Sequence, residues 1–124
     1  MTFIDTHTHI YDEAFAGEED AAIRRAVEAG VDILIQPDVD SGERDAMFSL
    51  CDKYPGILFP MLGLYPGSVG NNWKKEFESM LEYRDRKVVA IGEIGLDYHY
   101  GADFASEQKE AFRLQLELAA EMDL

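Results

Sequence analysis

The sequence predicts an α/β fold of four βα units, which corresponds to half of a TIM-type (β/α)8 barrel. Short apolar runs alternate four times with segments of helical period, a pattern typical of βαβ units and a parallel sheet. A complete barrel needs about 250 residues, and this chain has 124. An open doubly wound sheet is the structural alternative, although no glycine-rich phosphate loop follows the first strand.

The first two units have clear boundaries. Phe3-Ile4 indicates a short strand, and residues 18–29 form an amphipathic helix that Gly30 should end. Residues 31–36 are rich in β-branched side chains, and the following Pro37 should end this second strand.

A helix and a strand follow in the same order. Asp40 and Glu43 resemble a capping box, and the helix they open should bury one face. That face consists of Met47, Leu50, Cys51 and Tyr54. We expect a third strand over residues 57–64, in which Pro60 is unusual for a strand with neighbours on both sides.

The last part of the chain repeats the pattern. Residues 72–84 predict a helix, and residues 88–94 a fourth strand whose apolar run suits a position buried on both faces. Residues 104–122 predict the longest helix, with Phe112, Leu116 and Ala119 on its inner face. Nothing indicates a linker, so residues 1–124 are expected to form one domain.

Composition narrows the class of protein. Lys and Arg total 11 and Asp and Glu total 25, so the formal charge of −14 opposes passive attraction to a phosphate backbone. The single cysteine, Cys51, excludes an intrachain disulfide. The N-terminus does not resemble a signal peptide, and no apolar run is long enough to span a bilayer. We therefore expect a soluble cytoplasmic protein with no membrane partner.

Two histidines follow the first strand. His7 and His9 stand at i and i+2 on extended backbone, so both imidazoles project to the same side and can meet one cation. The alternative is a pair of solvated loop histidines. Asp5 lies at the end of the strand, where its carboxylate is able to orient an imidazole.

Glu93 follows an otherwise apolar strand. A carboxylate there is costly to bury without a metal or a basic partner, so Glu93 is a candidate metal ligand and catalytic residue. The alternative is a buried ion pair with Arg or Lys. Asp97 fits either a supporting carboxylate or a turn residue.

Tyr65 follows the third strand and is either a hydrogen-bonding phenol at the mouth of a site or a packed turn residue. Asp38, after the second strand, is interpreted as a turn residue. His7, His9, Tyr65 and Glu93 all follow the C-terminal ends of predicted strands. That end of a barrel is where catalysis takes place.

These motifs resemble those of the TatD-family deoxyribonucleases. Similar segments occur in family order along the chain, at residues 5–9 (DTHTH), 63–66 (GLYP), 92–98 (GEIGLDY) and, on the last helix, 108–119. The resemblance implies a barrel hydrolase that uses one or two divalent metal ions (Zn, Mg or Mn) to hydrolyse DNA or another phosphodiester. It implies that His7 and His9 bind one metal and that Glu93 binds a metal, bridging two.

The chain departs from the family pattern in two ways. The family usually has His where this chain has Tyr65, and a phenol is not a cationic donor at neutral pH. The family also continues, beyond the position of Leu124, into segments that supply two further histidines and a late aspartate ligand. His99 matches none of them. We therefore expect self-association or pairing with a missing C-terminal half. The alternatives are a non-catalytic, self-associating half barrel with a vestigial metal site, or a related barrel hydrolase of amides or small phosphoesters.

Overall fold

The computed structural model describes all residues 1–124 and contains one parallel sheet. Its strands are β1 (Phe3–Asp5), β2 (Val31–Gln36) and β3 (Leu58–Pro60), hydrogen-bonded in the order β1-β2-β3. Ile4 lies opposite Ile33 across the first pair, and Leu34 lies opposite Leu58 across the second. Consecutive strands that pair in parallel are what a barrel built from successive βα units requires. The predicted α/β class is confirmed.

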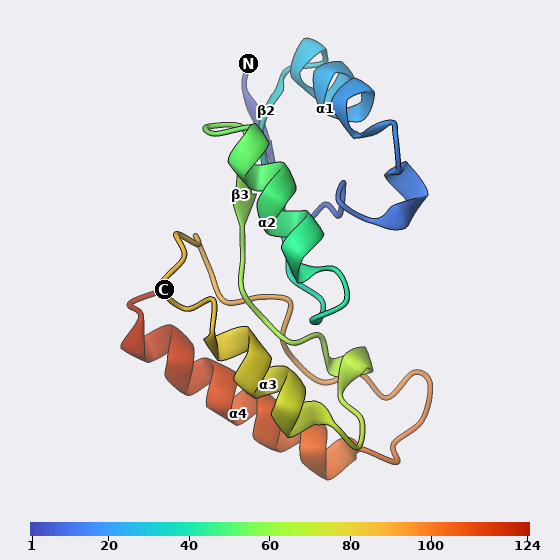
Figure 1. Ribbon diagram of the computed structural model, residues 1–124, viewed down its shortest axis with the longest axis vertical. Helices are drawn as coiled ribbons and strands as arrows, with labels where there is room; N and C mark the ends of the chain where they lie inside the picture. Colours follow the sequence, from blue (N-terminus) through green and yellow to red (C-terminus); the bar gives the residue numbers. More distant parts are fainter.

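Helices connect and cover the strands. They are α1 (Glu19–Glu28), α2 (Arg44–Lys53), α3 (Trp73–Leu81) and α4 (Ala105–Glu121), with short 3-10 turns η1 (Glu13–Phe15) and η2 (Pro66–Ser68). Helix α1 contacts β2, and α2 contacts β3. Helices α3 and α4 run side by side at the other end of the molecule (Figure 1). No helix is long and apolar enough to cross a membrane.

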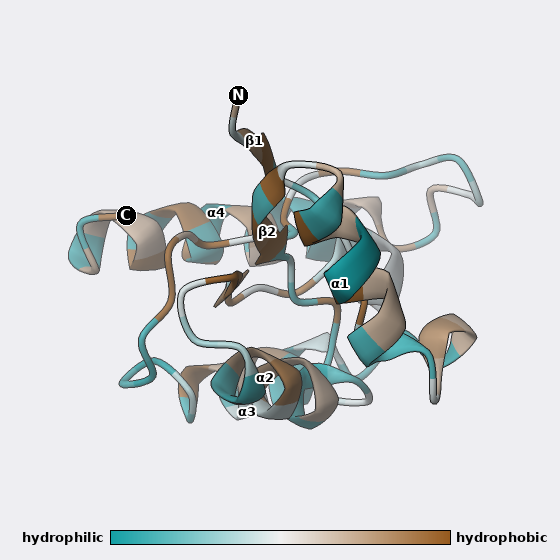
Figure 2. Cartoon of the chain, turned by 90° about the horizontal axis from the view of Figure 1, so that it is seen from above, coloured by the Kyte–Doolittle hydropathy of each residue, from teal (hydrophilic) through white to brown (hydrophobic).

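The core lies between the strands and the helices. Leu34 and Leu58 of the sheet are buried together with Met47 and Phe48 of α2. Figure 2 shows apolar residues in brown along β1 and β2 and polar residues in teal on part of α1. Helix α1 ends as predicted, because Gly30 adopts a left-handed φ of 91° that favours glycine.

The fourth strand predicted over residues 88–94 is not formed as a regular strand. Only an isolated parallel bridge joins Leu62 to Ile91. The segment nevertheless runs beside the continuation of β3, where Val89 N donates to Pro60 O at 3.0 Å and Gly92 N donates to Leu62 O at 2.9 Å. The third strand is likewise shorter than predicted and ends at Pro60, although Met61 N still donates to Gln36 O at 2.9 Å.

The predicted capping box before α2 is wrong. The helix begins at Arg44, one residue after Glu43, and Glu43 makes no side-chain capping bond. The Asp40 carboxylate instead accepts hydrogen bonds from Gly42 N at 2.9 Å and from the Ser68 hydroxyl at 2.7 Å. Asp40 therefore connects two loops and does not cap the helix.

The inner face predicted for the last helix is also wrong. The buried positions of α4 are Gln108, Ala111, Gln115 and Leu118, whereas Leu116 is half exposed. A hydrogen bond explains why the buried face differs from the predicted one. Gln115 accepts a hydrogen bond from Leu64 N at 2.6 Å, and this contact turns the glutamine face inward.

The β1 edge of the sheet is open. Strand β1 pairs only with β2, and the side chains of Phe3 and Ile4 are 53% and 55% exposed. Because successive strand residues point to opposite faces, β1 lacks apolar cover on both faces. An uncovered strand of this kind is a surface on which a further strand and its helix can pack.

Candidate metal centre

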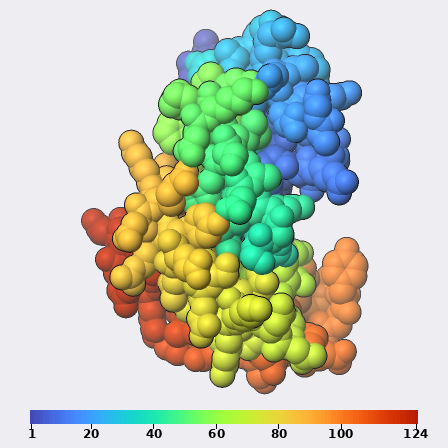
Figure 3. Space-filling model, in the orientation of Figure 1, coloured from blue at the N-terminus to red at the C-terminus, as the bar shows by residue number.

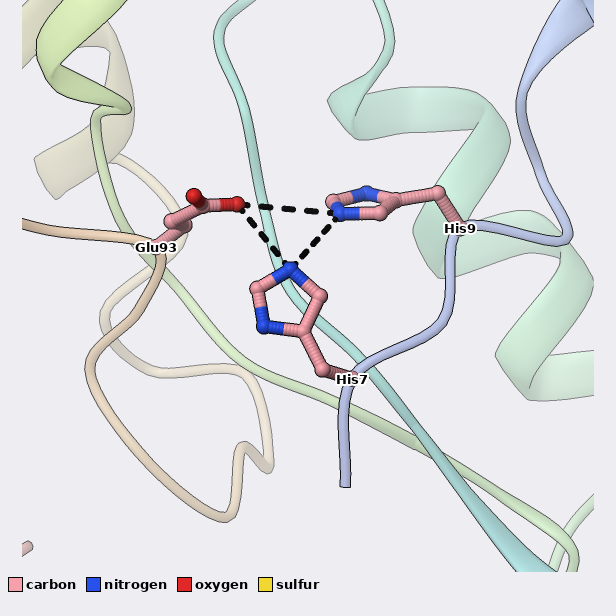
Figure 4. Close-up of side chains that lie close together, drawn as sticks. All are labelled: His7, His9 and Glu93. Atoms are coloured by element: carbon pink, nitrogen blue, oxygen red, sulfur yellow. Dashed lines mark hydrogen bonds and ion pairs between the residues drawn. The ribbon is translucent and has the colours of Figure 1, made fainter. Parts of the chain in front are cut away.

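Three side chains converge beyond the ends of the strands. The Nε2 atoms of His7 and His9 lie 3.1 Å apart, and Glu93 Oε2 lies 3.2 Å from His7 Nε2 and 3.7 Å from His9 Nε2. These three side chains point toward one another (Figure 4). Their ligand atoms all lie within 4.8 Å of one another, so one cation can contact all three. The alternatives of separate loop histidines and of a Glu93 ion pair with Arg or Lys do not describe this arrangement.

The end of β2 fixes the histidine loop. Thr8 N donates to Ile35 O at 3.1 Å, so the chain is still bonded to β2 three residues beyond the end of β1. Ile10 N donates to the buried Gln36 Oε1 at 2.9 Å. These two bonds lie on either side of His9 and hold its backbone against the sheet.

The residues just after β2 also hold the backbone of Glu93. Asp38 N donates to Gly92 O, and Glu93 N donates to Asp38 O, both at 3.0 Å. The Asp38 carboxylate forms a fully buried ion pair with Arg44, at 2.6 Å, and accepts a hydrogen bond from Gly63 N at 3.1 Å. Burial raises the pKa of Asp38 to about 6, against the opposing effect of Arg44. Asp38 is therefore a buried structural residue, and its interpretation as a turn residue is corrected.

His9 is the more enclosed of the two imidazoles. Its side chain is 29% exposed, against 55% for His7. Burial lowers the pKa of His9, the neighbouring His7 lowers it further, and Glu93 and Asp12 act in the opposite direction. The result favours the neutral imidazole, which is the form that binds metals.

The cluster faces an open cleft of about 440 Å³ lined by His7, His9, Asp12, Val39, Glu43, Tyr65 and Glu93. In the space-filling view the molecule is hollowed between the blue N-terminal segment and the orange loop near residue 100 (Figure 3). No Lys or Arg lines the cleft, and three carboxylates do. Attraction of an anionic group into this cleft therefore depends on a cation.

The remaining candidate residues lie around the cluster. Asp5 Oδ1 accepts from the backbone N of His7 at 3.1 Å, so its expected role of orienting an imidazole is not what the structure shows. Tyr65 donates its hydroxyl to Asp97 Oδ2 at 3.0 Å, and Asp97 Oδ1 accepts from His99 N at 2.9 Å. Tyr65 thus lines the cleft, while Asp97 orders the following loop.

Two features of the site were missed in the sequence. Tyr11 contacts His9 Nδ1 through its hydroxyl at 2.8 Å, and burial raises the pKa of this phenol. A polar side chain two residues after the second histidine was the available signal. The buried Asp38–Arg44 ion pair was the second missed feature. No sequence signal points to it, because a spacing of i and i+6 from a loop into the start of a helix matches no regular periodicity.

The chain is similar to known proteins along almost its whole length. The family described as TatD related DNase matches residues 4–124. The metal-dependent hydrolase YjjV of Escherichia coli is 38% identical over 126 residues, covering 98% of this chain and 48% of that protein. The 3'-5' ssDNA/RNA exonuclease TatD of Yersinia pseudotuberculosis is 34% identical, covering 89% of this chain and 43% of that protein. The chain therefore spans about half the length of the curated relatives it matches.

Solved structures of similar proteins support the same family relationship. The crystal structure of the YjjV protein superposes with a TM-score of 0.81 at 34% identity, covering 98% of this chain and 48% of that one. A TatD-family hydrolase from Entamoeba histolytica gives a TM-score of 0.78 at 27% identity, with coverage of 98% and 46%. These structures are TIM barrels, and this chain corresponds to about half of one. By family match, relatives and fold, the chain belongs to the TatD family.

Proposed function

We propose that this chain supplies the metal-binding N-terminal half of a hydrolase that cleaves phosphodiesters in DNA. The observation that carries the proposal is the convergence of His7, His9 and Glu93 on one point at the ends of the strands. Relatives named as a metal-dependent hydrolase and as a 3'-5' ssDNA/RNA exonuclease support the same reaction class.

The donor set fits a divalent cation. Two imidazole nitrogens and one carboxylate oxygen are ligands that zinc and manganese accept, and magnesium accepts the carboxylate. The 3.1 Å contact between the Nε2 atoms of His7 and His9 brings two lone-pair positions together. Two neutral imidazoles repel there unless a proton or a cation lies between them. We propose one cation on these three residues, with a second one sharing Glu93.

The residues of the cleft have distinct tasks in this proposal. His7, His9 and Glu93 hold the cation, and Glu93 is also close enough to the cleft to hold a water by hydrogen bonding. When bound, a divalent cation supplies Lewis acidity and lowers the pKa of water. Tyr65 presents a phenol on the same cleft, where it can donate to a substrate oxygen if it leaves Asp97.

We further propose that a second half completes the barrel and the ligand set. Three protein ligands satisfy one cation with an open position but leave two cations under-coordinated. The uncovered β1, with Phe3 and Ile4 exposed, is where further βα units can pack. The partner is a C-terminal half barrel, either continuous with this chain or separate. Pairing of two copies is the alternative, and it brings no new kind of ligand.

Cation binding is the first test. Titration of the purified 124-residue chain with Zn²⁺ or Mn²⁺ in a calorimeter should show one tight equivalent. The His7→Ala/His9→Ala double variant and Glu93→Gln should each weaken binding by at least about 10-fold. The matched control is His99→Ala, which removes the one histidine outside the cluster and should leave affinity unchanged. Equal affinity in the control and the cluster variants would overturn the assignment.

Hydrolysis is the second test. The chain alone, incubated with single-stranded DNA or a small phosphodiester and Mg²⁺, Mn²⁺ or Zn²⁺, should show little turnover. Adding the C-terminal half of a TatD-family relative should restore cleavage with this chain but not with the His7→Ala/His9→Ala variant. Robust cleavage by the chain alone, abolished by the double variant, would refute the need for a second half. Absence of cleavage in every combination would refute the proposed reaction.

A further inference from the structure

Tyr11 connects the candidate metal centre to the end of β2. Its hydroxyl lies 2.8 Å from His9 Nδ1 and also donates to the carbonyl of Pro37. The side chain is 7% exposed, so water does not compete freely for these bonds. The aromatic ring also packs edge-on against His9, with ring centroids 5.5 Å apart.

The direction of these two bonds follows from the available protons. A backbone carbonyl only accepts hydrogen bonds, and a tyrosine hydroxyl has one proton. The hydroxyl proton of Tyr11 therefore goes to Pro37 O, and the phenol oxygen must accept from His9. The donor is then Nδ1–H of His9, and a neutral imidazole that is protonated on Nδ1 has its lone pair on Nε2.

We propose that Tyr11 is a positioning residue that fixes His9 as the Nδ1–H tautomer and aims its Nε2 lone pair at the cation. This inference rests on the proposed metal site. It adds the group that makes one ligand of that site ready for the cation before binding. Metal-binding histidines usually donate their other ring N–H to an oxygen, and here the oxygen is a phenol held by the sheet.

The other histidine of the pair, His7, has no such support. His7 Nδ1 makes no hydrogen bond, and the His7 side chain is 55% exposed. Only its backbone N is fixed, through Asp5. The two imidazoles of the His-x-His pair are thus unequal: Tyr11 holds His9 through Nδ1, whereas the His7 ring is held only through Nε2, 3.1 Å from His9 Nε2 and 3.2 Å from Glu93 Oε2. Removal of the Tyr11 hydroxyl should therefore act directly on His9.

The tautomer can be measured without any metal. Long-range ¹H–¹⁵N spectra of the metal-free chain, at about pH 8, where imidazoles are neutral, should show His9 protonated on Nδ1. In Tyr11→Phe, which keeps the ring and loses only the hydroxyl, His9 should become a mixture of tautomers. The matched control is Tyr54→Phe, which loses a hydroxyl bonded to Asp20, a residue that does not line the cleft.

Zinc affinity gives the second measurement. Tyr11→Phe should weaken Zn²⁺ binding by about 10- to 100-fold, the usual effect of losing a group that supports a metal ligand. Tyr54→Phe should bind as the wild-type chain does. An Nε2–H tautomer of His9 in the wild-type chain would overturn the proposal, even if Tyr11→Phe fails to fold. So would a Tyr11→Phe variant with unchanged tautomer and affinity. Wild-type His9 as Nδ1–H together with no zinc binding would refute the proposed metal site and leave the tautomer assignment standing.

Discussion

Replacement of Arg44 by Met tests whether the buried Asp38–Arg44 pair holds the site's framework. Both side chains are 1% exposed, and Arg44 Nε lies 2.6 Å from Asp38 Oδ2. Methionine keeps most of the length and apolar stem of arginine but removes the guanidinium. The variant therefore leaves the Asp38 carboxylate buried next to Gly63 N with no cation beside it.

The structure sets the size of the effect. Removing one partner of a buried ion pair usually costs about 3–5 kcal/mol, because the other charge remains buried. The lower end of this range is appropriate here, since Asp38 Oδ1 and Arg44 Nη1 already have no hydrogen-bond partner in the wild-type chain. A loss of about 3 kcal/mol should lower the Tm of a domain of this size by roughly 10 °C.

The loss of stability in Arg44→Met should depend on pH. The pKa of Asp38 is about 6 in the folded chain, above its ordinary value of 3.8, because burial disfavours the carboxylate. Between these values the folded state binds more protons than the unfolded state, so stability falls as pH rises from about 4 through 6. Without Arg44 the folded pKa rises further. The deficit of Arg44→Met should therefore be largest at neutral pH and should shrink toward pH 5.

Thermal unfolding followed by circular dichroism at neutral pH and at about pH 5 measures both effects. A neutral pair, Asp38→Asn/Arg44→Met, should recover most of the lost Tm. The surface control is Arg86→Met, which breaks an exposed pair with Asp52 and should leave the Tm within about 3 °C. A Tm for Arg44→Met within that same margin at neutral pH, or an equal deficit at both pH values, would refute the reasoning.

Three further predictions follow from the packing. The isolated chain should associate through its open β1 edge, so light scattering after gel filtration should give a mass above 14.0 kDa at micromolar concentration, and a clean monomer would contradict this. Phe3→Lys should shift that equilibrium toward monomer, while Val27→Lys, on the exposed face of α1, should not. Gln115→Leu leaves Leu64 N without its acceptor and should cost about 1–3 kcal/mol in chemical denaturation, whereas Leu116→Gln on the exposed face should cost little.

The regular parts of the fold were predictable because local periodicity and tertiary packing agree there. Strand β2 and helix α1 match their predicted residues, since β-branched residues favour extended backbone and Gly30 ends the helix. The fourth strand did not form as predicted. Its apolar residues fit a strand with neighbours on both sides, but this chain provides a neighbour only on the β3 side. A strand that depends on its second neighbour cannot be inferred correctly from its own sequence.

Polar side chains account for the other errors. Helix α4 turns Gln108 and Gln115 inward because each satisfies a backbone group of a loop, Asp97 and Leu64 respectively. A hydrophobicity pattern assigns glutamine to the solvent face, so it selects the wrong stripe. Asp40 failed as a helix cap for a similar reason, because its carboxylate bonds to Gly42 and Ser68. A partner as distant as Ser68, 28 residues along the chain from Asp40, leaves no trace in the local sequence pattern.

The candidate site was partly predictable for a geometric reason. His7, His9 and Glu93 each follow an extended segment, and parallel neighbours bring the ends of such segments to one edge. Residues 36–38 support the candidate site through contacts that their positions in the sequence do not reveal. Gln36 holds the loop after His9, Pro37 holds Tyr11, and Asp38 holds the backbone of Glu93. Because three consecutive residues at and just after the end of β2 support candidate ligands from two distant segments, the geometry of the candidate site depends on the stability of β2. Arg44, which lies outside the cleft, should therefore affect the proposed metal site through Asp38.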